Sequence, residues 1–450
     1  MLPPSCDFQR RFFIKHRFAR CYLAAIFGNL LEHFDNALYV FAAPFIAPLF
    51  LGEKDPLSAL ILLYAIPLMG CAARPLGALF FGRIGDRQGR KKALFLSLLG
   101  LAVTTVAIGC LPTYHRVGNT AFFGLASIKI LQTFFLAGES AGGAVFALEH
   151  TPKGKRSLVA SLYDLSTMAG ILLASGLCLI FHRLGIIASA WRFLFYCGAL
   201  TAFFGLFLRK RTQEPEEFLS KSHYPSDFSF RRAGKDHFKT IFALTLASGF
   251  SHVTYAFAFV FMAVYAPLMT SLSQAKALAL NTPLMLFDAL LLPLFGYLAM
   301  RWGKEKIMLF GAGGIVLVAI PFFTFLKGAS LATVIALRLS IVFFGVAFAA
   351  PYYAWAVEKI PPFRRFTLLS LSNAFAYYFG KPTTALCLWL YKKTHLAAAP
   401  GIYLAVMATA ALAAVWALSK SPVLALSYSQ KKFRDDVSIP NRVYSSSQPP

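Results

Sequence analysis

The sequence predicts an all-α polytopic membrane protein in which twelve transmembrane helices form two six-helix pseudo-repeats. Three observations predict this class. Hydrophobic residues make up 58% of the 450-residue chain and charged residues only 14%, whereas soluble domains carry about 25% charged residues. The chain has room for about twelve apolar segments of roughly 20 residues each, joined by short loops. Finally, motifs from the first half of the chain return in the second half at a nearly constant spacing.

Taken in order, the apolar segments predict spans at residues 19–49, 57–81, 93–112, 120–149, 158–181, 191–208, 239–268, 277–300, 307–326, 331–357, 367–391 and 400–419. The prolines inside them are tolerated because neighbouring helices satisfy the freed backbone groups. The first span contains acidic residues and lacks a small-residue cleavage site, so we expect no cleaved signal peptide. The expected domains are an N-terminal bundle (1–208), a cytoplasmic linker loop (209–238), a C-terminal bundle (239–419) and a cytoplasmic tail (420–450).

The distribution of lysine and arginine predicts the orientation. The two termini and the loops between even- and odd-numbered spans hold 32 of the 44 Lys and Arg residues, and the opposite loops hold seven. The other five lie within spans or at their edges: Arg74, Lys129, Arg192, Arg338 and Lys381. By the positive-inside rule, both termini are cytoplasmic. Since the cations fall between apolar segments and not on one soluble face, the net charge of +25 does not indicate a nucleic-acid partner.

A repeat relates the two halves of the chain. Residues 147–162 return as residues 356–371 at an offset of 209, and the same offset pairs Lys129 with Arg338. Parallel six-span halves of this kind are related by an axis along the membrane normal, and they place a binding site near the bilayer midplane. The sequence therefore predicts a central site between the halves.

The loop between the second and third spans takes part in the repeat. It carries Gly82, Asp86, Arg87, Gly89 and Arg90. Its weaker copy at residues 296–306 lies at an offset of 214 and has Met300 in place of the acid. Glycines allow a tight reversal and close backbone approach. Only the first copy can make contacts that need a carboxylate.

This loop resembles the signature of the major facilitator superfamily, and shorter motifs narrow the resemblance to the metabolite:proton symporters. Those motifs are Gly28-Asn29-x-x-Glu32-x-Phe34-Asp35, Arg74-Pro75-Leu76-Gly77, Gly138-Glu139 and Glu149-x-x-Pro152-x-x-x-Arg156. The family includes importers of proline and betaine, citrate, 2-oxoglutarate and shikimate. The resemblance spans the whole chain and implies the major facilitator fold and solute transport coupled to protons.

Span one concentrates polar groups. Asn29, Glu32 and Tyr39 share one helical face, and Asp35 lies on its flank. An acid at the bilayer midplane costs about 2.5–3.5 kcal/mol, so the cluster must face a cavity or partner charges. We interpret it as a protonation and substrate site. The alternative is a static ion pair that fixes span one to a neighbouring helix.

Four cations within the spans are candidate partners for these acids: Arg74, Lys129, Arg338 and Lys381. Gln132 and Glu139 share a face of span four with Lys129. Because Lys129 and Arg338 are repeat equivalents, we expect them at similar depth on opposite sides of the central cavity. Two cations facing one cavity suit a carboxylate.

A zwitterionic solute is the alternative, since it needs only one of these cations. Aromatic rings such as those of Tyr255 and Tyr353 would then hold its ammonium group by cation–π attraction. His252 and Asp288 are single polar groups in spans seven and eight. Each could either belong to the site or make a hydrogen bond between helices, and the sequence does not decide between the two.

The resemblance also implies a latch in the loop after span two. Asp86 is expected against the N-terminus of span eleven, where the helix dipole favours an anion. Arg90 would pair with Glu149, whose repeat copy is Glu358. These contacts would close the halves on the cytoplasmic side and release in the inward-facing state.

Together these features predict a secondary active transporter that imports a small polar metabolite, either a carboxylate or a zwitterion, with protons by alternating access. An uncoupled facilitator, an exchanger or an exporter of the same fold is the alternative. A membrane-embedded enzyme is a remote one, because only His33 beside the span-one acids approaches a catalytic cluster. We expect a monomer in the inner membrane, driven by the proton gradient without a cofactor. The seven cysteines show no spacing typical of a disulfide framework or a metal site.

Overall fold

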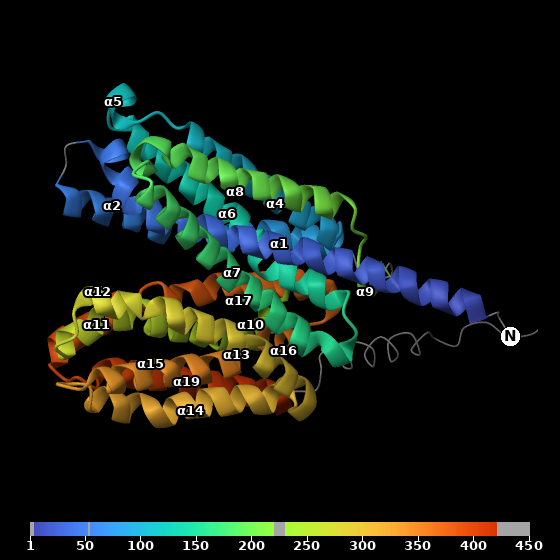
Figure 1. The fold of residues 1–450 in the computed structure, drawn as a ribbon. Helices are drawn as coiled ribbons and strands as arrows, with labels where there is room; N and C mark the ends of the chain where they lie inside the picture. Colours follow the sequence, from blue (N-terminus) through green and yellow to red (C-terminus); the bar gives the residue numbers. More distant parts are fainter. Residues whose placement is uncertain (1–3, 53–54, 220–229, 421–450) are drawn as a thin grey trace, which may run out of the picture.

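The structure, a computed structural model, describes residues 4–52, 55–219 and 230–420, and all regular elements in these ranges are helices. The predicted tail after residue 420 and the middle of the predicted linker loop lie outside the described residues. The helices form two layers, one from each half of the chain (Figure 1).

The first layer holds α1 (Pro4–Leu51), α2 (Pro56–Gly70), α3 (Ala73–Arg87), α4 (Arg90–Cys110), α5 (Tyr114–Val117), α6 (Thr120–Glu149), α7 (Arg156–Arg183) and α8 (Ile187–Lys210). The short α9 (Glu216–Leu219) follows it. The second layer holds α10 (Phe230–Tyr255), α11 (Met262–Met269), α12 (Gln274–Ala279), α13 (Asn281–Trp302), α14 (Lys304–Thr324), α15 (Leu331–Ala349), α16 (Tyr352–Lys359), α17 (Arg365–Gly380), α18 (Thr383–Thr394) and α19 (Ala399–Lys420). A π-helical turn, Ala256–Phe261, joins α10 to α11.

Eleven stretches of the described residues are long and apolar enough to cross a membrane. The remaining predicted span, residues 367–391, is divided between α17 and α18 at Lys381 and Pro382. Proline has no backbone N–H and a fixed φ, so it interrupts a helix. Neither piece reaches the length of a continuous span, although the two together cover the predicted segment.

The two layers meet along repeat-equivalent pairs of helices. α3 packs against α17, and α13 packs against α7. Gly82 permits the first approach, because a Cβ there would lie 2.7 Å from the Cα of Thr367. Gly296 permits the second, since its Cβ would lie 3.1 Å from the carbonyl oxygen of Ser157. The sequence repeat is therefore expressed in the packing between the halves.

Candidate functional site

A cavity of about 630 Å³ lies between the halves. Its wall is largely apolar, with polar side chains supplied by both layers: Asn29, His33, Asn36, Tyr39, Arg74, Lys129, Asp164, Ser248, His252, Tyr255, Asp288, Tyr352, Tyr353, Asn373, Tyr377 and Lys381. A concave, mostly apolar space with a few convergent polar groups is typical of a small-molecule site.

The sequence predicts Glu32 of α1 at the cavity, but among the described residues the wall includes its partners Arg74 and Ser140 and not Glu32, which lies behind them in a buried ion pair. Arg74 of α3 donates to Glu32 Oε1 at 3.1 Å and to Ser140 Oγ at 2.7 Å. Ser140 in turn donates to Glu32. The second carboxylate oxygen of Glu32 has no hydrogen-bond partner among the described residues. The predicted pairing of Arg74 with a span-one acid is therefore present.

Asp35 lies in a second polar group, formed by α1, α4 and α6. It accepts hydrogen bonds from Thr105 and, at 3.0 Å, from the side-chain amide of Gln132. Lys129 donates to Gln132 at 2.5 Å, and its ammonium lies 4.4 Å from the ring centre of Tyr39. Gln132 thus connects Asp35 to Lys129. Of these three residues only Lys129 lines the cavity, so the expectation that Asp35 and Gln132 face it is wrong: both are buried between helices of the first layer.

Asn29 and Tyr39 hold α1 against its neighbours. The Asn29 amide donates to Ser166 and Thr167 of α7 at 2.8 and 2.9 Å. The Tyr39 hydroxyl donates to the carbonyl oxygen of Leu63 at 2.9 Å. Both residues border the cavity, as expected, and both also make contacts between helices.

Arg338 does not lie where the repeat predicts. Its guanidinium is fully buried in the second layer and donates to the carbonyl oxygens of Ala258 and Ala277 at 2.8–3.0 Å, and to Asn281. The π-helical turn disturbs the regular backbone pairing at Ala258, so this carbonyl is available to Arg338. The expectation that Lys129 and Arg338 face each other across the cavity is wrong: the repeat relates their positions along the chain, not the rotation of each helix.

Glu139 is also placed differently from the expectation that it extends the Lys129 face. It forms a buried ion pair with Arg209 at the end of α8, with Arg209 Nη1 2.7 Å from Glu139 Oε2. Gly28 leaves room for this pair, because a Cβ there would overlap both side chains. The pair lies within the first layer and outside the cavity wall. Lys381, by contrast, faces the cavity at the break between α17 and α18.

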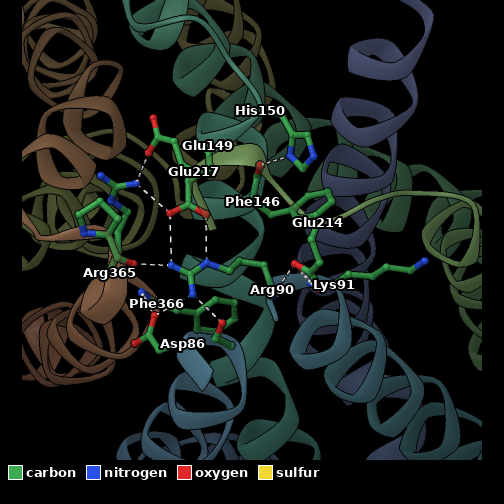
Figure 2. Close-up of polar contacts among 12 residues, drawn as sticks. Asp86, Arg90, Lys91, Phe146, Glu149, His150, Glu214, Glu217, Arg365 and Phe366 are labelled. Atoms are coloured by element: carbon green, nitrogen blue, oxygen red, sulfur yellow. Dashed lines mark hydrogen bonds and ion pairs between the residues drawn. The ribbon is translucent and has the colours of Figure 1, made fainter. Parts of the chain in front are cut away.

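A cluster of charges lies at one end of the contact between α3 and α17, and we call Asp86, Arg90, Glu149 and Arg365 the latch cluster (Figure 2). Asp86 accepts the backbone N–H groups of Phe366 and Thr367 at 3.1 and 2.9 Å. These are the first residues of α17, where the free N–H groups and the helix dipole favour an anion. The predicted contact with span eleven is present.

Arg90 lies at the centre of the latch cluster. Its guanidinium donates to Glu149 at 3.0 and 3.3 Å, to Asp86 at 3.1 Å, and to the carbonyl oxygen of Pro362 at 2.5 Å. Arg365 of α17 donates to Glu149 at 2.8 Å (Figure 2). Because Asp86 and Glu149 belong to the first layer and Pro362 and Arg365 to the second, these bonds hold the two layers together.

Two acids in the segment after α8, Glu214 and Glu217, lie beside the latch cluster and bind residues of it. Glu217 accepts hydrogen bonds from Arg156 and, at 2.8 Å, from Arg365. Burial alone would raise the pKa of Glu217, but its hydrogen bond to Arg365 and the two nearby guanidinium charges outweigh burial, so its pKa is lowered. Glu217 was not predicted from the sequence.

Glu214 caps α4 beside the latch cluster. It accepts the backbone N–H groups of Arg90 and Lys91 at 2.8 and 3.1 Å. Gly89 has φ = +119°, which favours glycine, and a Cβ there would lie 2.2 Å from the Glu214 carboxylate. Burial raises the pKa of Glu214 despite these hydrogen bonds.

The second copy of the latch pair is simpler. Lys304 donates to Glu358 at 2.6 Å, which reproduces the Arg90–Glu149 pair at an exposed edge. Met300 occupies the position equivalent to Asp86, so the copy has no acid for a helix N-terminus. Arg87, in the last turn of α3, is exposed at the edge of the cluster.

The sequence profile of the Major Facilitator Superfamily matches residues 25–385. The chain belongs to the Major Facilitator Superfamily. The glycine betaine/proline/ectoine/pipecolic acid transporter OusA of Dickeya dadantii is 25% identical over 416 residues, covering 88% of this chain and 82% of OusA. A putative proline/betaine transporter of Staphylococcus haemolyticus is 30% identical, covering 84% and 82%.

Solved structures of the superfamily share the fold. The proton:xylose symporter XylE aligns with a TM-score of 0.70 at 16% identity, covering 89% of this chain and 96% of XylE. The transporter FucP in an outward conformation aligns with a TM-score of 0.70 at 12% identity, covering 89% and 99%. The predicted fold class is confirmed. As a member of the Major Facilitator Superfamily, the chain is an integral membrane transporter of small solutes.

Two buried or cavity-lining charged residues of this Major Facilitator Superfamily member were missed by sequence reasoning. Asp164 lines the cavity from α7, and an isolated acid inside the apolar segment 158–181 is by default a candidate functional group. Arg209, the partner of Glu139, was assigned to the linker loop because it falls one residue beyond the predicted end of span six. Span ends are uncertain by a few residues, so a charge at such an end cannot be assigned to loop or helix from hydropathy.

Proposed function

We propose that the protein imports a small polar solute, a carboxylate or a zwitterion, together with protons. The observation that carries this proposal is a pair of buried acids behind the cavity wall, Glu32 with Arg74 and Asp35 with Gln132 and Lys129. Neither acid lines the cavity itself, but each shares its surroundings with a cation, Arg74 or Lys129, that does. Buried acids of this kind in membrane transporters mark proton and substrate pathways.

The coupling follows from charge balance. An ionised Glu32 neutralises Arg74, so a solute carboxylate has little to gain at that guanidinium. Protonation of Glu32 leaves Arg74 with a net positive charge in an environment of low dielectric, where an uncompensated charge is costly. Binding the solute carboxylate then restores the balance. Proton and anion therefore favour each other's binding, and Asp35 acts on Lys129 in the same way.

The latch cluster supplies the gate in this proposal. The lysine and arginine distribution supports placing it, and both termini, on the cytoplasmic side. The bundles formed by residues 1–208 and 239–419 then rock about the cavity, with 209–238 as the link between them and 420–450 as a cytoplasmic tail. The cluster holds the cytoplasmic side closed while solute and proton enter from outside, and its opening releases them.

Uptake into proteoliposomes tests this function. The purified protein is reconstituted, and uptake of proline, glycine betaine, citrate, 2-oxoglutarate and shikimate is measured with and without an inward proton gradient. We expect at least one of them to accumulate only when the gradient is present, and a protonophore to abolish accumulation. Equal uptake with and without the gradient would identify an uncoupled facilitator and contradict the proposal. Transport only out of the loaded vesicles against the gradient would identify an exporter.

The variants Glu32→Gln and Asp35→Asn test whether these two acids couple proton movement to solute transport. Each removes one titratable carboxyl group with little change in shape. We expect loss of gradient-driven accumulation but retention of solute exchange, because exchange does not require the proton to leave. The conservative control is Glu305→Gln, which changes an acid paired with Lys359 far from the cavity wall.

A further inference from the structure

Two acids of the cavity wall have no partner among the described residues. Asp164 of α7 and Asp288 of α13 line the cavity from opposite layers, on helices that pack against each other. Both therefore contribute negative charge to the same cavity from facing helices. The part of the chain that the structure describes offers neither of them a hydrogen bond or an ion pair, and the Asp288 residue is only 7% exposed.

This absence of partners sets the pair apart from the other buried acids. Glu32 has Arg74, Glu139 has Arg209, and Glu149 has Arg90 and Arg365. A buried carboxylate without a counter-charge is strongly unfavourable, and a second carboxylate nearby adds repulsion. Asp164 and Asp288 make no bond between helices that would explain their presence as structural. A positively charged ligand would relieve both penalties.

Three tyrosines lie in the same wall as the two acids. Tyr352 and Tyr353 lie on α16, which packs against α7, and the ring of Tyr353 lies 5.9 Å from that of Tyr163, the neighbour of Asp164. Tyr255 is at the end of α10. All three border the cavity. The face of a tyrosine ring attracts a cation, most strongly where water is excluded. The surroundings of the two acids therefore combine negative charge with aromatic faces, which suits an organic ammonium group better than a small hydrated metal ion.

We propose that Asp164 and Asp288, with Tyr255, Tyr352 and Tyr353, form a subsite for the ammonium group of the transported solute. This subsite rests on the proposed function, because it occupies the same cavity, and it selects a solute that carries a positive charge.

The cavity also provides a place for an opposite charge beside this subsite. The Arg74 guanidinium lies over the ring of Tyr377 at 3.5 Å, and both residues line the cavity. Lys381 borders the cavity beside Tyr377. One cavity therefore holds both the acid pair and these cations. A zwitterion can place its carboxylate at Arg74 and Lys381 and its ammonium group at the acid pair.

Binding of simple organic cations to the full-length protein in detergent tests this subsite independently of transport. Thermal unfolding is measured in increasing tetramethylammonium chloride and methylammonium chloride, with sodium chloride at equal ionic strength as the reference. Since a ligand that binds only the folded protein stabilises it, we expect at least one organic cation to raise the unfolding temperature above the sodium reference. The apparent affinity should fall at least about tenfold in Asp288→Asn and in Asp164→Asn, and Asp288→Glu should retain it. Glu305→Gln is the matched control and should behave as the wild type.

Three results would overturn the subsite. The first is that no organic cation stabilises the protein more than sodium chloride does. The second is that stabilisation by an organic cation persists in both asparagine variants. The third is that sodium itself stabilises the wild type but not those variants, which would identify a metal-cation site. Neither asparagine variant removes a partner from another residue, so both should fold. The subsite and the proposed function can fail separately. If organic cations do not bind, the protein can still import a carboxylate with protons. If uptake is not coupled to protons, the ammonium subsite still stands.

Discussion

Replacing Asp86 by asparagine tests the latch cluster most sharply. Asp86 accepts two backbone N–H groups of α17 and the Arg90 guanidinium, and its side chain is 2% exposed. Asparagine keeps one oxygen as an acceptor but turns an N–H2 group toward the remaining donors and loses the negative charge. Since a hydrogen bond to a charged group contributes about 1.5–3 kcal/mol, we expect the closed state to lose about 2–4 kcal/mol. That lowers the ratio of closed to open molecules about 30- to 1000-fold.

Amide hydrogen exchange measures this shift directly. In full-length protein embedded in lipid nanodiscs, the peptide that contains Phe366 and Thr367 should exchange faster in Asp86→Asn, because the two amides lose a charged acceptor. Uptake should fall in the same variant. Glu305→Gln removes an acid on the equivalent side of the second layer and should change neither quantity. Unchanged exchange and uptake in a correctly inserted Asp86→Asn protein would refute the latch.

Three further predictions concern packing and charge. Gly82→Val should open the contact between α3 and α17, at a cost of about 1–3 kcal/mol, and speed the same amide exchange. Its control is Gly313→Val, at a position where a Cβ meets nothing within 4 Å. Equal effects of the two substitutions would contradict the close approach at Gly82. Arg209→Met should lower thermal stability by about 3–5 kcal/mol, since it leaves Glu139 as an unpaired buried charge, and adding Glu139→Gln should recover part of the loss; a double variant no more stable than the single one would contradict the ion pair. The lowered pKa of Glu217 means that its contribution to the latch is complete above the usual glutamate pKa and is lost only as pH falls through the lowered value. The uptake of Glu217→Gln relative to the wild type should therefore be the same at about pH 5.5 and about pH 7.5, and a ratio that changes between them would show that Glu217 titrates in this range.

The fold could be predicted almost completely from the sequence. Chain length, the number of apolar segments and the repeat are properties of the whole chain. The fold class that they predict does not change when the predicted span ends are wrong by a few residues. The contacts of Asp86 and Arg90 could also be anticipated, because the resemblance of the loop to the family signature implies them and the repeat supplies Glu358 as the copy of the partner acid. The break at Lys381 and Pro382 was visible only as a proline within an apolar segment, a signal that many uninterrupted spans also show.

The cavity was less predictable. The direction in which a side chain points depends on the rotation of its helix, and hydropathy leaves this rotation open where a segment is apolar on all sides. Arg338 was therefore expected to face the cavity, whereas its guanidinium points into the second layer and binds backbone carbonyl oxygens there. Asp288 could be recognised as a single polar group in its span, whereas Asp164 was missed, and the placement of both acids in one wall depends on the packing of α7 against α13. Such pairing across the layers is not encoded in local spacing.

The most direct test of proton-coupled transport is the movement of protons with solute. Proteoliposomes containing a pH-sensitive dye are exposed to each of the five candidate solutes in the absence of a preset gradient. The account predicts internal acidification on addition of the transported solute, abolished by a protonophore and absent in Asp35→Asn. Solute entry without internal acidification would contradict it.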